Sequence, residues 1–293
     1  WAEIDAQKIV FNAHYLMYLD TAVAGYWRAL ALPYAESMES LGGDLYVRKA
    51  TVEYHGSARY DDRLDIGMRC ARIGNSSIQF LGGVFRGDDL LVGGAGADSL
   101  DGGAGFDRAD YSASGAAIAI NLTTGVGTGG EAEGDRLTGI EWITGSDFND
   151  TLTGSAADEK LEGGLGLDVL SGGAGADTLL GGANDDTLVG GAGADSIDGG
   201  AGFDTADYST SSGAIQVILD GSAASGGDAQ GDVLTAIERV VGSNFNDTII
   251  GNSGGEQLDG GAGNDLLNGA AGSDTLFGGA GDDTLIGGAG ADT

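Results

Sequence analysis

A nine-residue unit repeats along most of the chain and restricts its fold more than any other feature. From Gly163 the sequence reads GGLGLDVLS, GGAGADTLL, GGANDDTLV, GGAGADSID and GGAGFDTAD without a gap. The same frame covers residues 93–110, 145–207 and 242–293. A short fixed period is typical of solenoids, in which each repeat packs only on its neighbours. We therefore expect an elongated stack of repeats after residue 92.

A longer period is superimposed on the nonapeptide. The segment GGAGFDRADYS at 102–112 returns as GGAGFDTADYS at 199–209, which is 97 residues later. This indicates two tandem modules, 93–198 and 199–293, with inserts at 111–144 and 208–241. Each insert holds one run of alternating apolar residues, which predicts an extra strand packed beside the solenoid. The acidic residues Glu131, Glu133 and Asp135 and their counterparts are expected to lie in solvated loops.

The residue type at each position of the nonapeptide has a physical explanation. Glycine at positions one, two and four permits positive φ angles in a tight turn. Positions seven to nine form a very short strand whose middle residue points inward, namely Leu170, Leu179, Leu188 and Ile197 in successive repeats. Two nonapeptides then make one flattened coil, and residues 18 apart stack about 4.8 Å from each other. The pattern predicts a mainly β protein with a parallel β-roll.

The aspartate at position six indicates a metal. Two ionised carboxylates about 5 Å apart repel by roughly 3–4 kcal/mol at an effective dielectric constant near 20. A divalent cation between stacked turns would reverse this repulsion, and oxygen ligands without His or Cys favour Ca²⁺ over zinc, copper and Mg²⁺. The candidate ligands are Asp98, Asp107, Asp150, Asp168, Asp177, Asp186, Asp195, Asp204, Asp247, Asp265, Asp274, Asp283 and Asp292.

GGAGADTLL and its neighbours resemble the hemolysin-type, or RTX, calcium-binding repeats over about 93–293. The resemblance implies that one ion is shared by repeats n and n+2. The implied pairs are Asp168 with Asp186, Asp177 with Asp195, Asp186 with Asp204, Asp247 with Asp265, Asp265 with Asp283, and Asp274 with Asp292. Position six is glutamate at Glu159 and Glu256, so these two turns depart from the repeat.

Residues 1–92 have a different composition and hold the single Pro, the single Cys and both His of the chain. Apolar residues at helical spacing predict a helix from Ala13 to about Leu30. Strand-like runs follow at 44–55, 64–73 and 77–86, with a tight turn at 74–76 between the last two. One helix followed by antiparallel strands favours an α+β layer.

The sequence of this part resembles hotdog-fold acyl-CoA thioesterases of the 4-hydroxybenzoyl-CoA thioesterase type. The segments that carry the resemblance are WAEIDAQKIVFNAHYLMYLD and VEYHGSARYDDRLDIGMRCARIGNSSIQF. The resemblance implies that Asp5 is the nucleophile or general base, and that a backbone N–H near Asn12 polarises the thioester carbonyl. It also implies an acyl-CoA substrate and pairing of hotdog domains into a dimer. Because Gly93 begins the repeats where the last hotdog strand would continue, we expect a truncated domain.

Composition excludes several functions. A net charge of −32 argues against nucleic acid as a partner, one Cys excludes a disulfide scaffold, and no apolar run reaches the length of a membrane span. Three hypotheses remain open. The chain is a secreted calcium-binding β-roll protein that folds on Ca²⁺ binding, an acyl-CoA thioesterase with a repeat appendage, or a non-catalytic spacer or adhesin segment. The thioesterase-like part alone would suggest the cytoplasm, whereas the repeats suggest an extracellular location.

Overall fold

The computed structural model describes residues 64–73, 78–86, 90–103 and 105–293. Its contacts divide the chain into two units, Trp1–Asp89 and Leu90–Thr293. The predicted helix at 13–30, the predicted strand at 44–55 and the candidate catalytic residues Asp5 and Asn12 lie outside the described residues.

The described part of the first unit is one antiparallel hairpin. Strand β1 (Leu64–Ile73) pairs with β2 (Ile78–Arg86), with Leu64 opposite Arg86 and Ile73 opposite Ile78. The register shifts between Cys70 and Arg72, as in a β-bulge. The two strands match the predicted runs at 64–73 and 77–86.

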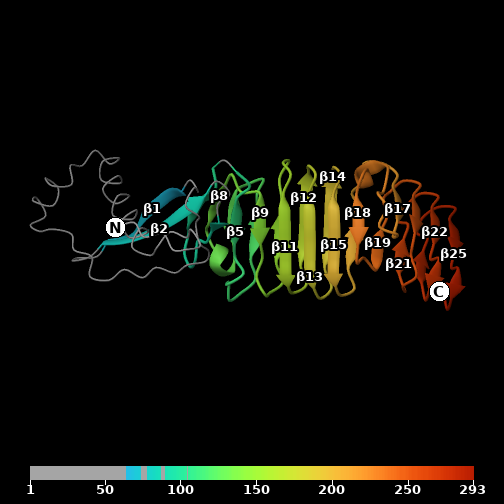
Figure 1. Cartoon of the computed structure of the whole chain (residues 1–293). Coiled ribbons are helices and arrows are strands. Elements are labelled where there is room, and N and C mark those ends of the chain that lie inside the picture. Colours follow the sequence, from blue (N-terminus) through green and yellow to red (C-terminus); the bar gives the residue numbers. More distant parts are fainter. Residues whose placement is uncertain (1–63, 74–77, 87–89, 104) are drawn as a thin grey trace, which may run out of the picture. The chain divides into compact units, whose positions relative to one another are not determined.

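The second unit is a roll built from short strands in stacked sheets (Figure 1). An 11-stranded sheet contains, in spatial order, β24 (Thr275–Phe277), β21 (Gln257–Asp259), β19 (Arg239–Val241), β16 (Thr205–Asp207), β14 (Thr187–Ala192), β12 (Val169–Ala174), β10 (Thr151–Thr153), β6 (Ala119–Asn121), β7 (Val126–Thr128), β8 (Arg136–Thr138) and β4 (Ser99–Asp101). A 7-stranded sheet contains β18 (Val233–Thr235), β15 (Ser196–Ala201), β13 (Thr178–Ala183), β11 (Lys160–Leu165), β9 (Trp142–Thr144), β5 (Arg108–Asp110) and β3 (Leu90–Leu91).

The remaining strands lie in the C-terminal block. A 4-stranded sheet contains β17 (Gln216–Ile218), β20 (Thr248–Ile250), β22 (Leu266–Asn268) and β25 (Thr284–Ile286), and β23 (Ala271–Gly272) pairs with β26 (Ala289–Gly290). Helical structure in the described residues consists of two 3-10 turns, η1 (Gly130–Ala132) and η2 (Gly227–Ala229). No helix of the described part is long and apolar enough to cross a membrane.

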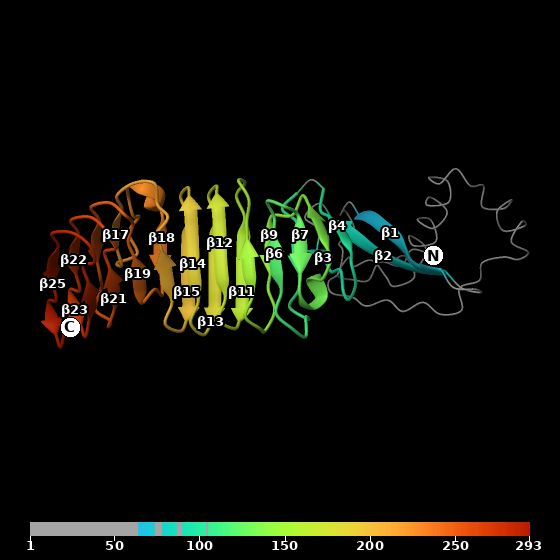
Figure 2. The same ribbon diagram turned by 180° about the vertical axis from the view of Figure 1, so that it is seen from behind.

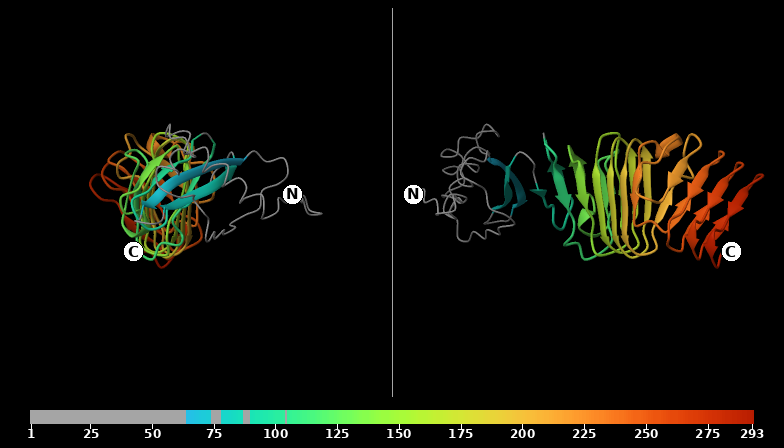
Figure 3. Two further views of the ribbon diagram at one scale, coloured as in Figure 1. Left: turned by 90° about the vertical axis from the view of Figure 1, so that its left-hand side faces the viewer. Right: turned by 45° about the vertical axis from the view of Figure 1, so that its right-hand side comes forward.

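The register confirms the predicted coil of 18 residues. The chain alternates between sheets at each nonapeptide, so that β11, β13 and β15 share one sheet and β12 and β14 share the other. Leu170 pairs with Leu152 on one side and with Leu188 on the other, while Leu179 pairs with Leu161 and Ile197. All six side chains are fully buried between the sheets. Figures 2 and 3 show the stacked strands of the roll from behind and from two further sides.

The inserts do not pack beside the roll, as the alternating runs had predicted, but form coils of the roll itself. Strand β6 pairs in parallel with β10, which places Ile120 next to Leu152, and β9 lies between β5 and β11, which places Ile143 next to Leu161. Both isoleucines are at most 1% exposed. Because each insert presents an apolar side chain in register with the buried column, the stack continues through it.

Candidate metal centres in the turns of the roll

The turns between strands require glycine for two reasons. Gly164, at position two of its repeat, has a φ of 111°, which is unfavourable for a residue with a Cβ. A Cβ at this position would also lie 2.6 Å from the carbonyl oxygen of Ser146 in the preceding coil. Consecutive turns are therefore stacked with their backbones in close contact, and the position-six carboxylates lie within this stack.

A ladder of hydrogen bonds connects the carboxylates. The backbone N–H at position six donates to Oδ1 of the aspartate one coil later, for example from Asp168 to Asp186 and from Asp186 to Asp204, both at 2.8 Å. The same bond joins Asp177 to Asp195, Asp247 to Asp265, Asp265 to Asp283, and Asp274 to Asp292. The structure thus brings together all six carboxylate pairs implied by the repeat spacing.

The second carboxylate oxygen of these residues is the most informative atom of the roll. Oδ2 is buried and has no hydrogen-bond partner in the described residues at Asp168, Asp177, Asp186, Asp195, Asp204, Asp265 and Asp274. A buried ionised oxygen without a partner is costly, because it loses its hydration and gains nothing in return. Its repeated occurrence at one position of the repeat fits a cation-binding position rather than an isolated packing defect.

A backbone carbonyl converges on the same space. A Cβ built on Gly181 would lie 2.5 Å from Oδ2 of Asp186 and 2.6 Å from the carbonyl oxygen of Gly199 in the next coil. Gly172 stands in the same relation to Asp177 and to the carbonyl of Gly190. The bare α-carbon at position one therefore lets Oδ2 and the carbonyl oxygen lie close to it and to each other, and a Cβ there would collide with both. We call this group of converging oxygen atoms the cradle.

The electrostatic environment opposes full ionisation without a cation. Burial raises the pKa of Asp168 and of Asp177 to about 7 and that of Asp186 to about 6. Neighbouring carboxylates contribute in the same direction, whereas the backbone N–H donor lowers each pKa. Each turn thus favours either a proton or a metal ion beside its carboxylate.

The donor set fits calcium. No group of three or more His, Cys, Asp or Glu side chains converges anywhere in the described residues. The cradles of Gly172 and Gly181 each combine Oδ2 of one aspartate with a backbone carbonyl of the next coil. Carboxylate and carbonyl oxygens are the hard ligands that Ca²⁺ prefers.

Four position-six carboxylates have a different environment. Ser146 donates its N–H and its hydroxyl to Asp150, the latter at 2.8 Å, and Ser243 closes the turn of Asp247 in the same way. The carboxylate of Glu159 accepts from Ser155, and that of Glu256 accepts from the N–H of Asn252. These turns have a Ser or Asn at position two in place of Gly. The N–H of that residue, together with the hydroxyl where it is Ser, donates hydrogen bonds to the carboxylate of the same turn. Asp150 and Asp247, both predicted as ligands, belong to this group.

Sequence reasoning missed two buried carboxylates in the inserts. Asp135 and Asp232 were expected in solvated loops, but both are fully buried, so this expectation is wrong for them. Asp232 accepts the N–H of Asp195 at 2.9 Å and the hydroxyl of Tyr208 at 2.8 Å. Asp135 accepts the N–H of Asp98 in the same manner. The detectable signal was the Gly-Asp dipeptide, which recurs at the same 97-residue displacement.

The other predicted ligands lie near the ends of the roll. Asp98 and Asp107 are buried, and Asp107 donates its N–H to the carboxylate of Glu141 at 3.0 Å. Asp283 and Asp292 are half-buried in the last two turns. The ladder of N–H to carboxylate bonds continues to Asp107 at one end and to Asp283 and Asp292 at the other. The last two carboxylates are more exposed than those in the middle of the roll.

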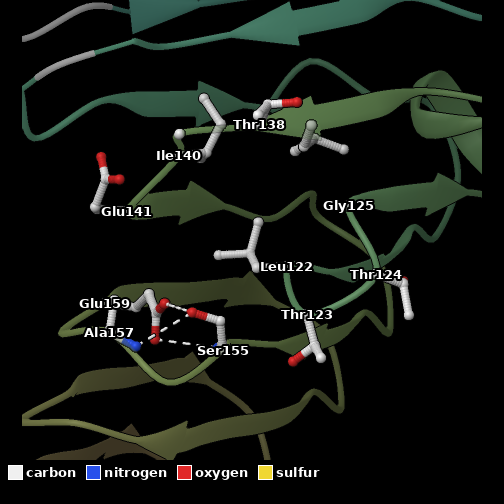
Figure 4. Close-up of a pocket in the computed structure, with 12 residues that line it drawn as sticks. Leu122, Thr123, Thr124, Gly125, Thr138, Ile140, Glu141, Ser155, Ala157 and Glu159 are labelled. Carbon is white, nitrogen blue, oxygen red and sulfur yellow. Dashed lines mark hydrogen bonds between the residues drawn. The ribbon is translucent and has the colours of Figure 1, made fainter.

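A cavity of about 340 Å³ lies where the first insert meets the following coil (Figure 4). Leu122, Ile140, Glu141 and Glu159 are among its lining residues. The bonds drawn in Figure 4 hold the carboxylate of Glu159 against Ser155. That carboxylate is therefore engaged within its own turn, and the cavity lacks the unpartnered oxygens of the neighbouring cradles.

Two family models match the chain. The model described as the RTX calcium-binding nonapeptide repeat (4 copies) matches residues 86–109, 137–170, 171–206, 235–267 and 259–293, which is more than half of the sequence. The thioesterase superfamily model matches residues 7–93, a range that contains Asn12 and begins just after Asp5. Both resemblances predicted from the sequence are thereby confirmed. A search of curated proteins finds no match.

Proposed function

We propose that this chain, which belongs to the RTX calcium-binding nonapeptide repeat family, is a secreted protein whose roll folds when Ca²⁺ binds between its stacked turns. The buried, unpartnered Oδ2 of the position-six aspartates is the observation that supports this coupling. The sites exist only when two turns are stacked, so the unfolded chain cannot form them, and binding energy becomes folding energy.

The residues around one site illustrate the coupling. Asp168 and Asp186 supply carboxylates from consecutive turns, and Gly181 supplies its backbone carbonyl. Bound Ca²⁺ would supply the positive charge that converts the repulsion between the two carboxylates into attraction. The glycines at position one leave room for the carboxylate and carbonyl oxygens to converge, and the buried leucines on either side hold the turns in register.

Far-UV circular dichroism of the whole chain, recorded in chelator and in millimolar Ca²⁺, tests this proposal. We expect a strand signal that develops with Ca²⁺ and disappears when the chelator is restored. A full strand signal in chelator would contradict coupled folding, even if the folded roll then bound calcium.

An extracellular location follows from the same reasoning. RTX repeats are typical of secreted proteins, and calcium at millimolar concentration outside the cell would occupy weak sites. The single Cys leaves no disulfide to staple the fold, so the metal takes that role. Fractionation of the native producer, with antibody detection in cells and in medium, tests this location, and retention of the chain in the cytoplasm would contradict it.

The match at residues 7–93 favours a second candidate function, hydrolysis of an acyl-CoA thioester. Asp5 would act as nucleophile or base, with the N–H near Asn12 polarising the carbonyl, and two such domains would pair. Release of CoA thiol from a panel of thioesters tests this function, with Asp5→Asn as the control. Equal rates for both proteins would exclude Asp5 as the catalytic group. Calcium binding without turnover on any substrate would instead favour a spacer or adhesin.

A further inference from the structure

The second insert returns to the stack next to the last turn of the middle block. Asp204, the position-six residue of that turn, is fully buried, and its Oδ2 has no hydrogen-bond partner in the described residues. In the regular repeats this oxygen faces the turn one coil later. For Asp204 the next turn is not a nonapeptide, because the insert follows it and β16 pairs with β19, which lies at the end of that insert.

The residues that meet Asp204 reproduce the regular cradle with other amino acids. Glu238 accepts the N–H of Asp204 through Oε2 at 2.9 Å, which is the bond that an aspartate accepts elsewhere in the ladder. The N–H groups of Glu238 and Arg239 donate to the Asp204 carbonyl at 3.1 and 2.9 Å. The pairing of β16 with β19 continues this register. Glu238 therefore occupies the ladder position of a position-six aspartate, 34 residues later instead of 18.

A backbone carbonyl is also present. A Cβ on Gly199 would meet the carbonyl oxygen of Ala236 and, at 2.7 Å, Oδ2 of Asp204. Ala236 has a φ of 49°, a left-handed conformation that is uncommon for a residue with a Cβ. This conformation directs its carbonyl to the place that the position-one carbonyl takes in the regular turns. In the first module Gly139, with a φ of 58°, has the same relation to Gly102.

We propose that Asp204, Glu238 and the carbonyl of Ala236 form a further Ca²⁺ site, which connects the nonapeptide blocks 145–207 and 242–293 across the second insert. The site rests on the proposed calcium-dependent function and extends it beyond the nonapeptide spacing. Because Glu238 lies near the end of the insert, directly before the C-terminal block, a metal bound here holds that block to the middle block. The first module repeats the arrangement, since Glu141 accepts the N–H of Asp107 and donates its own N–H to the Asp107 carbonyl.

The number of calcium ions retained by the whole chain in equilibrium dialysis tests this site. We expect Glu238→Ala to retain one ion fewer than the native protein. Asp220→Asn is the matched control, because this carboxylate of the same insert is exposed and accepts the N–H of Ser222. It is expected to retain the native number. A native number of ions in Glu238→Ala would overturn the proposal, whereas absence of ions from the native protein would overturn the calcium-dependent function as a whole.

A second variant keeps the test valid if Glu238→Ala does not recover the calcium-dependent strand signal. Glu238→Gln retains the side-chain volume and an acceptor for the N–H of Asp204, but it removes the charge. We expect one site to weaken by roughly tenfold or more, because even an indirect partner of a metal ligand contributes that much affinity. Titration of Glu238→Gln with native affinity at every site would overturn the proposal.

Discussion

Substitution of Asp186 by asparagine tests the assignment of the unpartnered carboxylates. Asp186 pairs with Asp168 and with Asp204, so Asp186→Asn damages two candidate sites. Each site contributes about 2.7 kcal/mol when calcium is at 100 times its dissociation constant. Loss of two sites therefore removes about 5 kcal/mol, which corresponds to a decrease in Tm of roughly 10–20 °C for a domain of this size.

Asp150→Asn provides the control, since it removes the same charge from a turn that Ser146 closes. We expect a loss of about 1 kcal/mol from the weakened hydrogen bonds, equal at all calcium concentrations. The assay is thermal unfolding over a series of calcium concentrations at about pH 8, where these carboxylates are ionised. Asp186→Asn should flatten the increase of Tm with calcium, and Asp150→Asn should only displace it. Equal slopes of Tm against calcium concentration for the two variants would refute the distinction between turns with an unpartnered Oδ2 and turns whose carboxylate is hydrogen-bonded by a serine.

Three further predictions concern the same turns. Because the folded pKa values of Asp168 and Asp177 (about 7) lie above the unfolded value near 4, the metal-free fold loses stability as pH rises through this window. Circular dichroism in metal-free buffer should show more strand at about pH 5 than at about pH 8, and the opposite trend would contradict the pKa direction. Gly181→Ala should abolish calcium binding at the site of Asp186, because the methyl group would collide with Oδ2 of Asp186 and with the carbonyl of Gly199 and displace them. Calorimetry with an unchanged number of ions would exclude that location. Leu179→Ala should cost about 2–5 kcal/mol in calcium-saturated denaturant unfolding, whereas Leu285→Ala, at a position that is 48% exposed, should cost far less.

The register of the nonapeptides could be predicted because two independent signals share one period. Glycines such as Gly164 mark the turns, and residues such as Leu179 mark the buried strands, so that both fix the same 18-residue coil. The carboxylate pairs follow from that coil without further information. A period that is set by both backbone conformation and burial leaves no alternative register.

The inserts could not be predicted in the same way, because their residues reach the stack without the nonapeptide spacing. Asp232 looks like one acid among several in a polar loop, and only the fold shows that it lies beneath Asp195 and accepts a bond from Tyr208. Glu238 likewise enters the ladder through a turn that contains no Gly-Gly pair. Sequence separation alone does not reveal which insert residue replaces a repeat residue.

Serine in the turns is a further feature that the sequence contained but spacing did not explain. Ser146 and Ser243 replace glycine at position two, and a substitution of this kind is easily taken for a degenerate repeat. The structure shows that each hydroxyl bonds to the position-six carboxylate of its own turn. The chemistry at position two therefore distinguishes turns that are satisfied by the protein from turns that present an oxygen to a metal.

Parallel measurement of calcium uptake and strand content during one calcium titration tests the central claim most directly. If the turns stack only when metal ions bind between them, the curves of calcium uptake and strand content coincide and share one midpoint in the native chain. Strand content that reaches its final value before any ion is retained would show that the roll folds without the metal, and would contradict the account.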